Sequence, residues 1–193
     1  IQRMLLDRVE DSKTGEILVP EMHVEISDKV RKEAEELGNL LGDELWSQLP
    51  VVDTLRPQNE GVAEILLDMN WRPAMSVIGA NGMPPTQTAG NVLRTHTDLK
   101  LSFRIPPGVN SEIIDSIVKE TLEKNPPYGS KVEYTPDAAA DGFHAQTMDG
   151  KIADALSSAS LHITGLPPMA TWVGGTIPFM AMMQEKYPSA QFF

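Results

Sequence analysis

Residues Gly90–Pro107 read GNVLRTHTDLKLSFRIPP, and this stretch decides the fold because it predicts a β-strand with two chemically different faces. Within Leu99–Ile105 every second residue is apolar, which is the period of a half-buried strand. Two prolines follow and end the strand, since proline donates no hydrogen bond to a ladder. The other face is polar and includes Arg104. Such a face is typical either of a solvated surface or of a site where the arginine fork binds a carboxylate.

The sequence around this strand predicts helices and further strands. Ser27 is a candidate N-cap for a helix that reaches about Leu41, and Asn110 or Ser111 begins a second helix that reaches about Lys124. Helices placed around antiparallel strands predict the α+β class, with a sheet that carries helices on one face. The other expected elements are a helix end at Ile1–Ser12, a helix or strand at Val62–Met69, strands at Trp71–Gly79, Ser130–Thr135 and Leu161–Ile163, and helices at Lys151–Ser160 and Phe179–Met183.

The composition is that of an ordinary globular protein, with 41% hydrophobic and 22% charged residues. The formal net charge of −11 argues against a nucleic-acid partner, which requires a basic face. Apolar runs are all shorter than the ~20 residues of a membrane span, so no membrane association is predicted. The absence of cysteine excludes disulfides and thiolate chemistry and favours a reducing compartment, so we expect a cytoplasmic protein.

Four segments, spread in order over almost the whole chain, carry a resemblance to a known enzyme family. They are Met4–Gly15 (MLLDRVEDSKTG), Trp71–Gly79 (WRPAMSVIG), Gly90–Pro107 and Trp172–Phe179 (WVGGTIPF). Each is weak alone, but together they resemble the zinc-dependent two-metal exopeptidases, which include carnosinase, glutamate carboxypeptidase, succinyl-diaminopimelate desuccinylase and aminoacylase.

The resemblance implies a fold and a division of the chain. Residues 1–140 would form the lid, or dimerisation, domain, a ferredoxin-like antiparallel sheet that here lacks its first strand. Residues 141–193 would form a partial α/β segment of the catalytic domain. The turn-rich stretch Pro136–Gly142 is a candidate hinge between them. Because the family dimerises through this lid, the resemblance also implies a homodimer with twofold symmetry.

The resemblance further implies an activity. The parent protein would hydrolyse a peptide or N-acyl amide bond with a water activated by two zinc ions and a glutamate base. In family order the metal ligands lie outside this chain, so no metal ligand is expected here and the chain alone is predicted to be inactive. The H-x-D triplet at His96–Asp98 and the His23–Glu25 pairing are interpreted as chance. The implied substrate is a peptide or N-acyl amino acid with a free carboxylate.

The resemblance also assigns candidate substrate-binding residues. Arg104 matches the lid arginine that binds the substrate carboxylate, and Asn91 matches a lid position that contacts substrate. The glycine motif corresponds to Gly174, Gly175 and Thr176, although the family usually has glutamate where this chain has Val173. From the residues alone, this motif predicts equally a helix N-terminus that binds an anion or a simple capped helix. His144, near the lid exit, is a further candidate or else an exposed loop histidine.

Two other classes of function stay open. The chain could be a stand-alone, non-catalytic dimerisation or interaction module, for which a twofold homodimer is equally expected. It could also be a regulatory domain of ferredoxin-like shape that binds a small molecule, which rests on fold analogy alone. Within the peptidase hypothesis, a dipeptidase, a deacylase and a desuccinylase are not distinguished by these residues.

Overall fold

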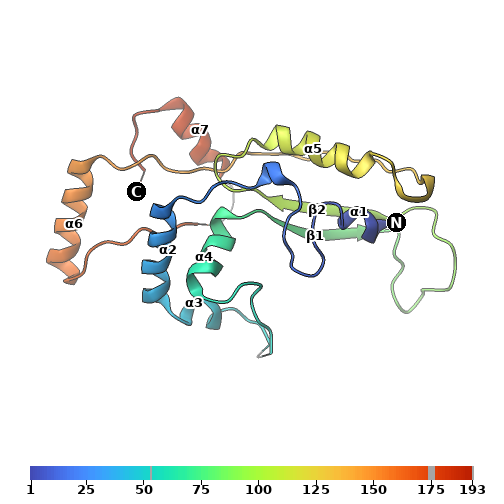
Figure 1. The fold of residues 1–193 in the computed structure, drawn as a ribbon, viewed down its shortest axis with the longest axis horizontal. Helices are drawn as coiled ribbons and strands as arrows, with labels where there is room; N and C mark the ends of the chain where they lie inside the picture. Colours follow the sequence, from blue (N-terminus) through green and yellow to red (C-terminus); the bar gives the residue numbers. More distant parts are fainter. Residues whose placement is uncertain (53, 174–176, 193) are drawn as a thin grey trace.

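A two-stranded antiparallel sheet lies at the centre of the computed structural model, which describes residues 1–52, 54–173 and 177–192. Figure 1 shows helices arranged along and beyond this sheet in an elongated molecule. The predicted α+β class is confirmed at this level. The elements are α1 (Gln2–Leu6), the 3₁₀ turn η1 (Pro20–Met22), α2 (Asp28–Leu41), α3 (Glu44–Ser47), α4 (Val62–Trp71), β1 (Ala74–Asn81), β2 (Asp98–Arg104), α5 (Ser111–Glu123), the 3₁₀ turn η2 (Pro127–Gly129), α6 (Gly150–Thr164) and α7 (Pro178–Lys186).

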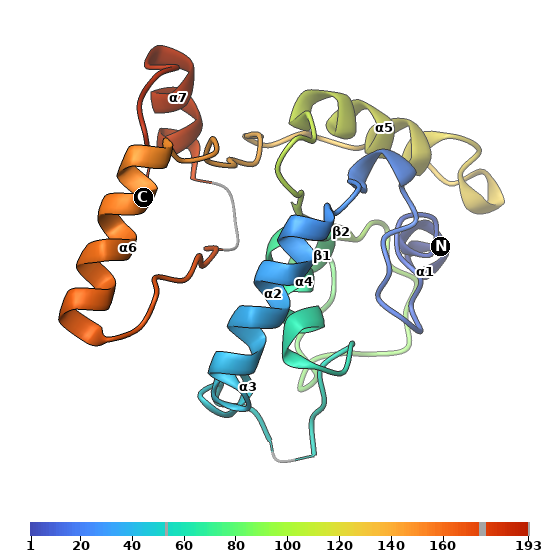
Figure 2. The same cartoon turned by 60° about the vertical axis from the view of Figure 1, so that its left-hand side comes forward.

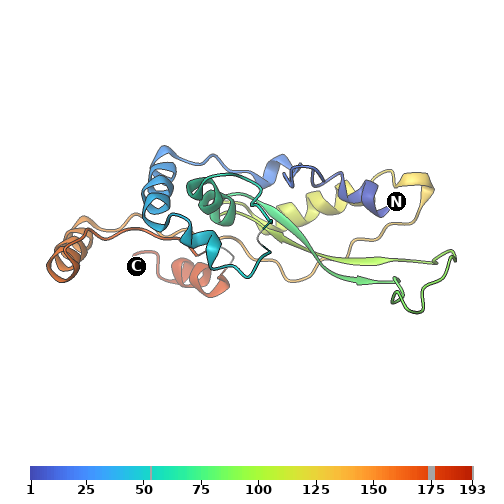
Figure 3. The same ribbon diagram turned by 90° about the horizontal axis from the view of Figure 1, so that it is seen from below.

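The sheet has one covered and one open face, as the alternation in its second strand predicts. Met75 lies opposite Phe103 in the register, and both side chains pack against the main core. Figure 3 shows α5 and the N-terminal segment on this side of the strands. The polar positions of the strands therefore face away from α5.

The main core forms between α5, the sheet and the N-terminal segment. The Asn110 side chain caps α5 by accepting a hydrogen bond from the Ile113 N–H at 2.9 Å. Helical spacing then places three apolar residues of α5 on the buried side, each worth about 1.5–3 kcal/mol on burial. The buried residues of this core are Val9, Ile17, Val19, Met22, Val109, Ile114, Val118 and Leu122.

A second core lies between α2 and α4. Ser27 caps α2 as predicted, accepting from the Val30 N–H at 3.4 Å. The two helices come very close where Gly38 meets Ala63, since a Cβ on Gly38 would lie 3.0 Å from the Ala63 nitrogen. The buried residues of this core are Ile26, Val30, Ala34, Leu67 and Trp71. Val62–Met69, for which helix and strand were both open, is helical.

Three predicted elements differ in the structure. The predicted strand at Ser130–Thr135 is wrong, because α5 side chains bind the segment instead of a ladder. The Tyr134 N–H donates to Glu123 at 2.8 Å, and its hydroxyl donates to Asp115 at 2.5 Å. The predicted strand at Leu161–Ile163 is also wrong, because α6 continues to a left-handed Gly165. The helix predicted over Ile1–Ser12 ends at Leu6, where the chain turns.

The sheet itself is smaller than the ferredoxin-like expectation. Among the described residues it contains only β1 and β2, so the ferredoxin-like detail is not confirmed. The strand expected at Trp71–Gly79 is present but begins at Ala74. Its start is later because α4 runs through Trp71, and Pro73 follows.

The C-terminal part of the chain has a different character from the rest. No described residue after Pro127 is fully buried, and Figure 2 shows α6 and α7 standing away from the sheet. The two ends of this part meet, because the Phe143 and Phe192 rings form an edge-to-face pair at 5.3 Å. The Gln146 side chain also donates to the Pro188 carbonyl at 2.9 Å. Across the described residues, no helix is long and apolar enough to cross a membrane.

Candidate functional site

Arg104 is the last residue of β2 and lies on the open face of the sheet. It pairs in register with Ala74, and the buried Pro106 follows two residues later. Its side chain is exposed, and no described residue forms a hydrogen bond or an ion pair with it. The guanidinium is therefore accessible to an external anion, and this exposure agrees with both interpretations of the polar face, a solvated surface and a carboxylate-binding site.

Lys100 lies on the same face as Arg104 and contacts the segment that follows η2. Its ammonium group forms an ion pair with Asp137 at 2.9 Å. This hydrogen bond, together with one from the Ala138 N–H and the lysine charge, lowers the pKa of the Asp137 carboxyl below its ordinary value. The carboxylate of Asp137 therefore has its own cationic partner on this face.

The C-terminal residues of the predicted hinge at Pro136–Gly142 are bound to neighbouring segments. Asp141 accepts a hydrogen bond from the Ser111 N–H at 2.7 Å, which lowers the pKa of the Asp141 carboxyl. Gly142 forms a bridge with Pro107, and a Cβ on the glycine would lie 2.8 Å from the Pro107 nitrogen. Only glycine permits this backbone approach. The segment is therefore fixed beside the end of β2.

An aromatic cluster lies at the same end of the sheet as Arg104. Trp71, which ends α4 three residues before Ala74, contacts the His144 ring edge-to-face with centroids 5.0 Å apart. It also contacts Trp172 edge-to-face at 6.3 Å. Trp71 is 8% exposed, and its buried Nε1 has no hydrogen-bond partner among the described residues. His144 is exposed, as a loop histidine would be, yet its ring rests on a buried tryptophan.

Asn91 lies at the opposite end of the sheet. It is exposed in the loop between β1 and β2, which Figures 1 and 3 show extending away from the strands. The strand from Asp98 to Arg104, roughly 20 Å long at 3.3 Å per residue, lies between this loop and the arginine. The structure thus brings His144 to the Arg104 end and leaves Asn91 at the far end.

The candidate residues Gly174, Gly175 and Thr176 lie outside the described residues. The structure describes their neighbours. Trp172 packs against the core between α2 and α4. After these residues, the helix expected at Phe179–Met183 is present as α7, which begins with Pro178 in its first turn.

A metal site does not fit the described residues. No three of their histidine, aspartate or glutamate side chains come together to hold an ion. The His96 ring contacts the Thr95 hydroxyl at 3.0 Å, and His23 contacts the Ile17 carbonyl at 2.7 Å. The histidines of the two chance pairings thus have ordinary local contacts, and no chemical step through a metal is derived from this chain.

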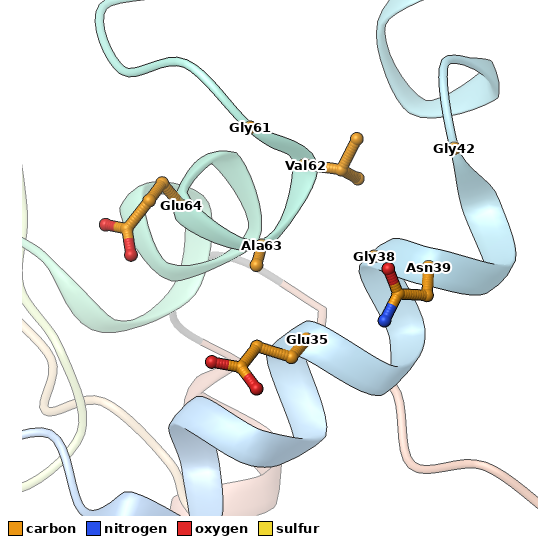
Figure 4. A pocket seen from close by; sticks show the side chains of 8 residues that line it. All are labelled: Glu35, Gly38, Asn39, Gly42, Gly61, Val62, Ala63 and Glu64. Carbon is orange, nitrogen blue, oxygen red and sulfur yellow. The ribbon is translucent and has the colours of Figure 1, made fainter.

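Figure 4 shows a hollow between α2 and α4 that sequence reasoning missed. Its walls carry the Glu35 and Glu64 side chains, and its floor is the close contact at Gly38. The Glu64 carboxylate already pairs with Arg72 at 2.7 Å, which leaves no free pair of carboxylates for general acid–base chemistry. The glycine inside a predicted helix was the sequence signal for this close approach.

The aromatic cluster was also missed by sequence reasoning. Trp71 and Trp172 are more than one hundred residues apart in the sequence, and neither belongs to a pattern that predicts contact. The signal available was their placement within two of the four family-like segments. Nothing in the sequence indicated that Lys100 and Asp137 form an ion pair, apart from the position of Lys100 on the polar face of the strand.

Comparison with known proteins identifies relatives for part of the chain. No family model matches it. The cysteinylglycine-S-conjugate dipeptidase of Corynebacterium striatum is 26% identical over 133 residues, which cover 65% of this chain and 28% of that protein. The Cys-Gly metallodipeptidase of Saccharomyces cerevisiae is 30% identical over 131 residues, which cover 63% of this chain and 26% of that protein. The matches span about a quarter of the length of these curated relatives.

Solved structures share the fold. Human carnosine dipeptidase 1 matches with a TM-score of 0.67 at 22% identity, over 94% of this chain and 38% of that one. A metallo-carboxypeptidase of the M20 family from Sulfolobus solfataricus matches with a TM-score of 0.63 at 12% identity, over 95% and 41%. Both curated relatives are thus named dipeptidases, and the solved structures are a carnosine dipeptidase and a metallo-carboxypeptidase of the M20 family. These matches confirm the resemblance inferred from the four segments.

Proposed function

We propose that the chain forms the lid part of a zinc-dependent exopeptidase or amidohydrolase that cleaves a peptide or N-acyl amide bond. Residues 1–140 would be the lid and residues 141–193 part of the catalytic domain. The names of the relatives support the chemistry, since both curated matches are dipeptidases. The lack of fully buried described residues after Pro127 supports a separate C-terminal part, and we place its boundary at Pro136–Gly142.

In this proposal Arg104 binds the terminal carboxylate of the substrate. The single observation that carries it is the exposed guanidinium at the end of β2, without a partner among the described residues, on the face opposite the core. A planar guanidinium can donate two parallel hydrogen bonds to a carboxylate, which fixes the orientation of the ligand as well as its charge. Such orientation places the scissile bond for attack in the parent enzyme.

The remaining candidates have secondary roles in the same proposal. His144 would contact substrate near Arg104, where Trp71 supports its ring. Gly174, Gly175 and Thr176 would bind the substrate backbone, and Asn91 would contact substrate from its loop. Zinc belongs to the parent enzyme and would be held by residues outside this chain. A cytoplasmic location remains a prediction from the absence of cysteine.

The test is the hydrolysis of a matched pair of substrates by the parent enzyme, one dipeptide with a free carboxylate and one with a C-terminal amide. Arg104→Met is expected to lower kcat/KM for the free dipeptide by about 10- to 100-fold, the cost of a lost charge-assisted hydrogen bond. The amidated dipeptide should lose little. Arg94→Met, an exposed arginine of the hairpin loop, is the control and should change neither. An equal loss on both substrates would contradict the role of Arg104.

A specific observation also favours the alternative, a non-catalytic dimerisation module. Within the described residues β1 pairs only with β2, so its other edge lacks a strand, and Val77 and Ile78 of β1 are about half exposed (49% and 58%). An unpaired strand edge readily pairs with another chain. Sedimentation of the chain would show a stable dimer if this function holds, and a monomer at all concentrations would exclude it.

A further inference from the structure

Two serines share the open face of the sheet with Arg104. The register places Ser76 opposite Ser102, and Ala74 opposite Arg104. Directly opposite residues of an antiparallel pair point to the same face, with Cβ atoms about 4.5–5.5 Å apart. Residues two apart in a strand also share a face, at a spacing of about 6.7 Å. Both hydroxyls therefore lie beside the arginine, on the side opposite the core residues Met75 and Phe103.

The two serine hydroxyl groups, like the Arg104 guanidinium, have no hydrogen-bond partner among the described residues. No described residue forms a hydrogen bond with the side chain of Ser76 or Ser102. Ser76 is exposed and Ser102 is half-buried. Ala74 adds only a methyl group opposite Arg104, so the space over these three side chains is not filled from the sheet itself.

The acidic residues on this face of the sheet do not pair with Arg104. Asp137, which reaches the face from the following segment, is paired with Lys100 at 2.9 Å. Asp98 begins β2, roughly 20 Å from Arg104 along the strand. Asp141, in the segment beside the end of β2, accepts from the Ser111 N–H instead. Among the described residues no acid forms an ion pair with Arg104, so a positive charge and two hydroxyl donors without partners lie at this end of the sheet.

We infer that Ser76 and Ser102, together with Arg104, form one seat for the terminal carboxylate of the substrate. A carboxylate has about four lone-pair sites, of which a bidentate arginine uses two. The two serine hydroxyls supply donors for the others. This inference rests on the proposed role of Arg104 and adds the residues that determine specificity.

The seat also explains a preference for a carboxylate over a carboxamide. A carboxamide offers one oxygen acceptor, and its NH₂ group places donor hydrogens against the arginine and serine donors. Sites built to match a polar group reject analogues that leave their own donors unpaired. The three side chains together therefore favour free acids more strongly than Arg104 alone.

The experiment is a titration of the 193-residue chain with N-acetylglycine, followed by the backbone amide signals of β1 and β2 in NMR spectra. Ser76→Ala and Ser102→Ala are each expected to weaken binding about threefold to tenfold, the contribution of one exposed hydrogen bond to a charged group. Ser102→Thr retains the hydroxyl and suits a strand, so it should bind as the unaltered chain does. Ser157→Ala, on α6, is the matched control and should have no effect.

The outcomes separate this inference from the proposed function. If Arg104→Met abolishes binding while both alanine variants bind normally, the seat is wrong and the arginine role stands. If Arg104→Met has no effect on binding, both are wrong. If the unaltered chain shows no binding, this inference is wrong, and the role of Arg104 in the parent enzyme is decided by the matched pair of substrates. N-acetylglycinamide should bind more weakly than N-acetylglycine, and the difference should shrink in the Ser76→Ala/Ser102→Ala double variant. An unchanged difference would also overturn the seat.

Discussion

Replacement of Trp71 by alanine tests whether the aromatic cluster anchors the C-terminal part of the chain. Trp71 is 8% exposed and packs with the core between α2 and α4 while its ring contacts His144 and Trp172. Truncation of a buried tryptophan costs about 3–5 kcal/mol, because the transfer free energy is lost and a cavity remains. Trp71→Ala should lower the free energy of unfolding by that amount.

The unpaired indole nitrogen sharpens this prediction. A buried donor without a partner costs about 1–3 kcal/mol, and Trp71→Phe removes that donor while it keeps an aromatic ring. The gain offsets much of the lost contact area, so Trp71→Phe should change the free energy of unfolding by less than about 1 kcal/mol. The free energies of unfolding of the alanine and phenylalanine variants should therefore differ by more than the loss of the aromatic ring alone would produce.

The assay is urea denaturation followed by far-ultraviolet circular dichroism, which does not depend on tryptophan emission. The control is Trp46→Ala, since Trp46 lies half-buried in the short helix α3 and should cost less than about 1 kcal/mol. NMR spectra give a local readout, because the His144 ring protons should move when the Trp71 indole is lost. The anchor is refuted if Trp71→Ala costs no more than Trp46→Ala and the His144 signals stay in place.

Two further predictions concern the main core. Arg8 donates to the carbonyls of Thr121, Lys124 and Asn125 at 2.9, 2.6 and 2.8 Å, which satisfies the C-terminal end of α5. Arg8→Met should cost about 1.5–3 kcal/mol by urea denaturation, whereas the exposed Arg3→Met should cost almost nothing. Burial, and then the hydrogen bond to Asp115 and its charge, raise the pKa of Tyr134 far above its ordinary value. The folded state retains this proton, so stability present below about pH 10 should fall as the pH rises further, and Tyr134→Phe should remove that fall in alkaline denaturation curves.

The sequence predicts those features whose cause is local. Alternation along Leu99–Ile105 identifies β2 and its two faces, because the side chains of a strand point alternately to either side. Side-chain caps identify the starts of α2 and α5, because Ser27 and Asn110 satisfy N–H groups of their own first turns. In these elements the residues that determine the structure are neighbours in the chain.

Prediction from the sequence fails where the local structure depends on a residue that is distant in the chain. The alternation in Lys131–Tyr134 resembles a strand, yet Glu123 of α5 accepts from the Tyr134 N–H, so no ladder forms there. The brief strand expected at Leu161–Ile163 fails for a different reason, because the preceding helix has no stop signal before Gly165. The Trp71 cluster could not be predicted, since its members come from three separate segments.

The sequence also does not predict which of the candidate site residues lie close together. Asn91 and Arg104 belong to one family-like segment, but β2, roughly 20 Å long, lies between Arg104 and the loop that holds Asn91. An extended dipeptide spans about 7 Å, so the two side chains of one copy cannot bind the same dipeptide. His144 and Trp172, distant in sequence, lie instead at the Arg104 end of the sheet. In the proposed function, a substrate site at this end would therefore combine Arg104 with residues of the C-terminal part, and a role for Asn91 would require that its loop reach a different place, such as the site of a second copy.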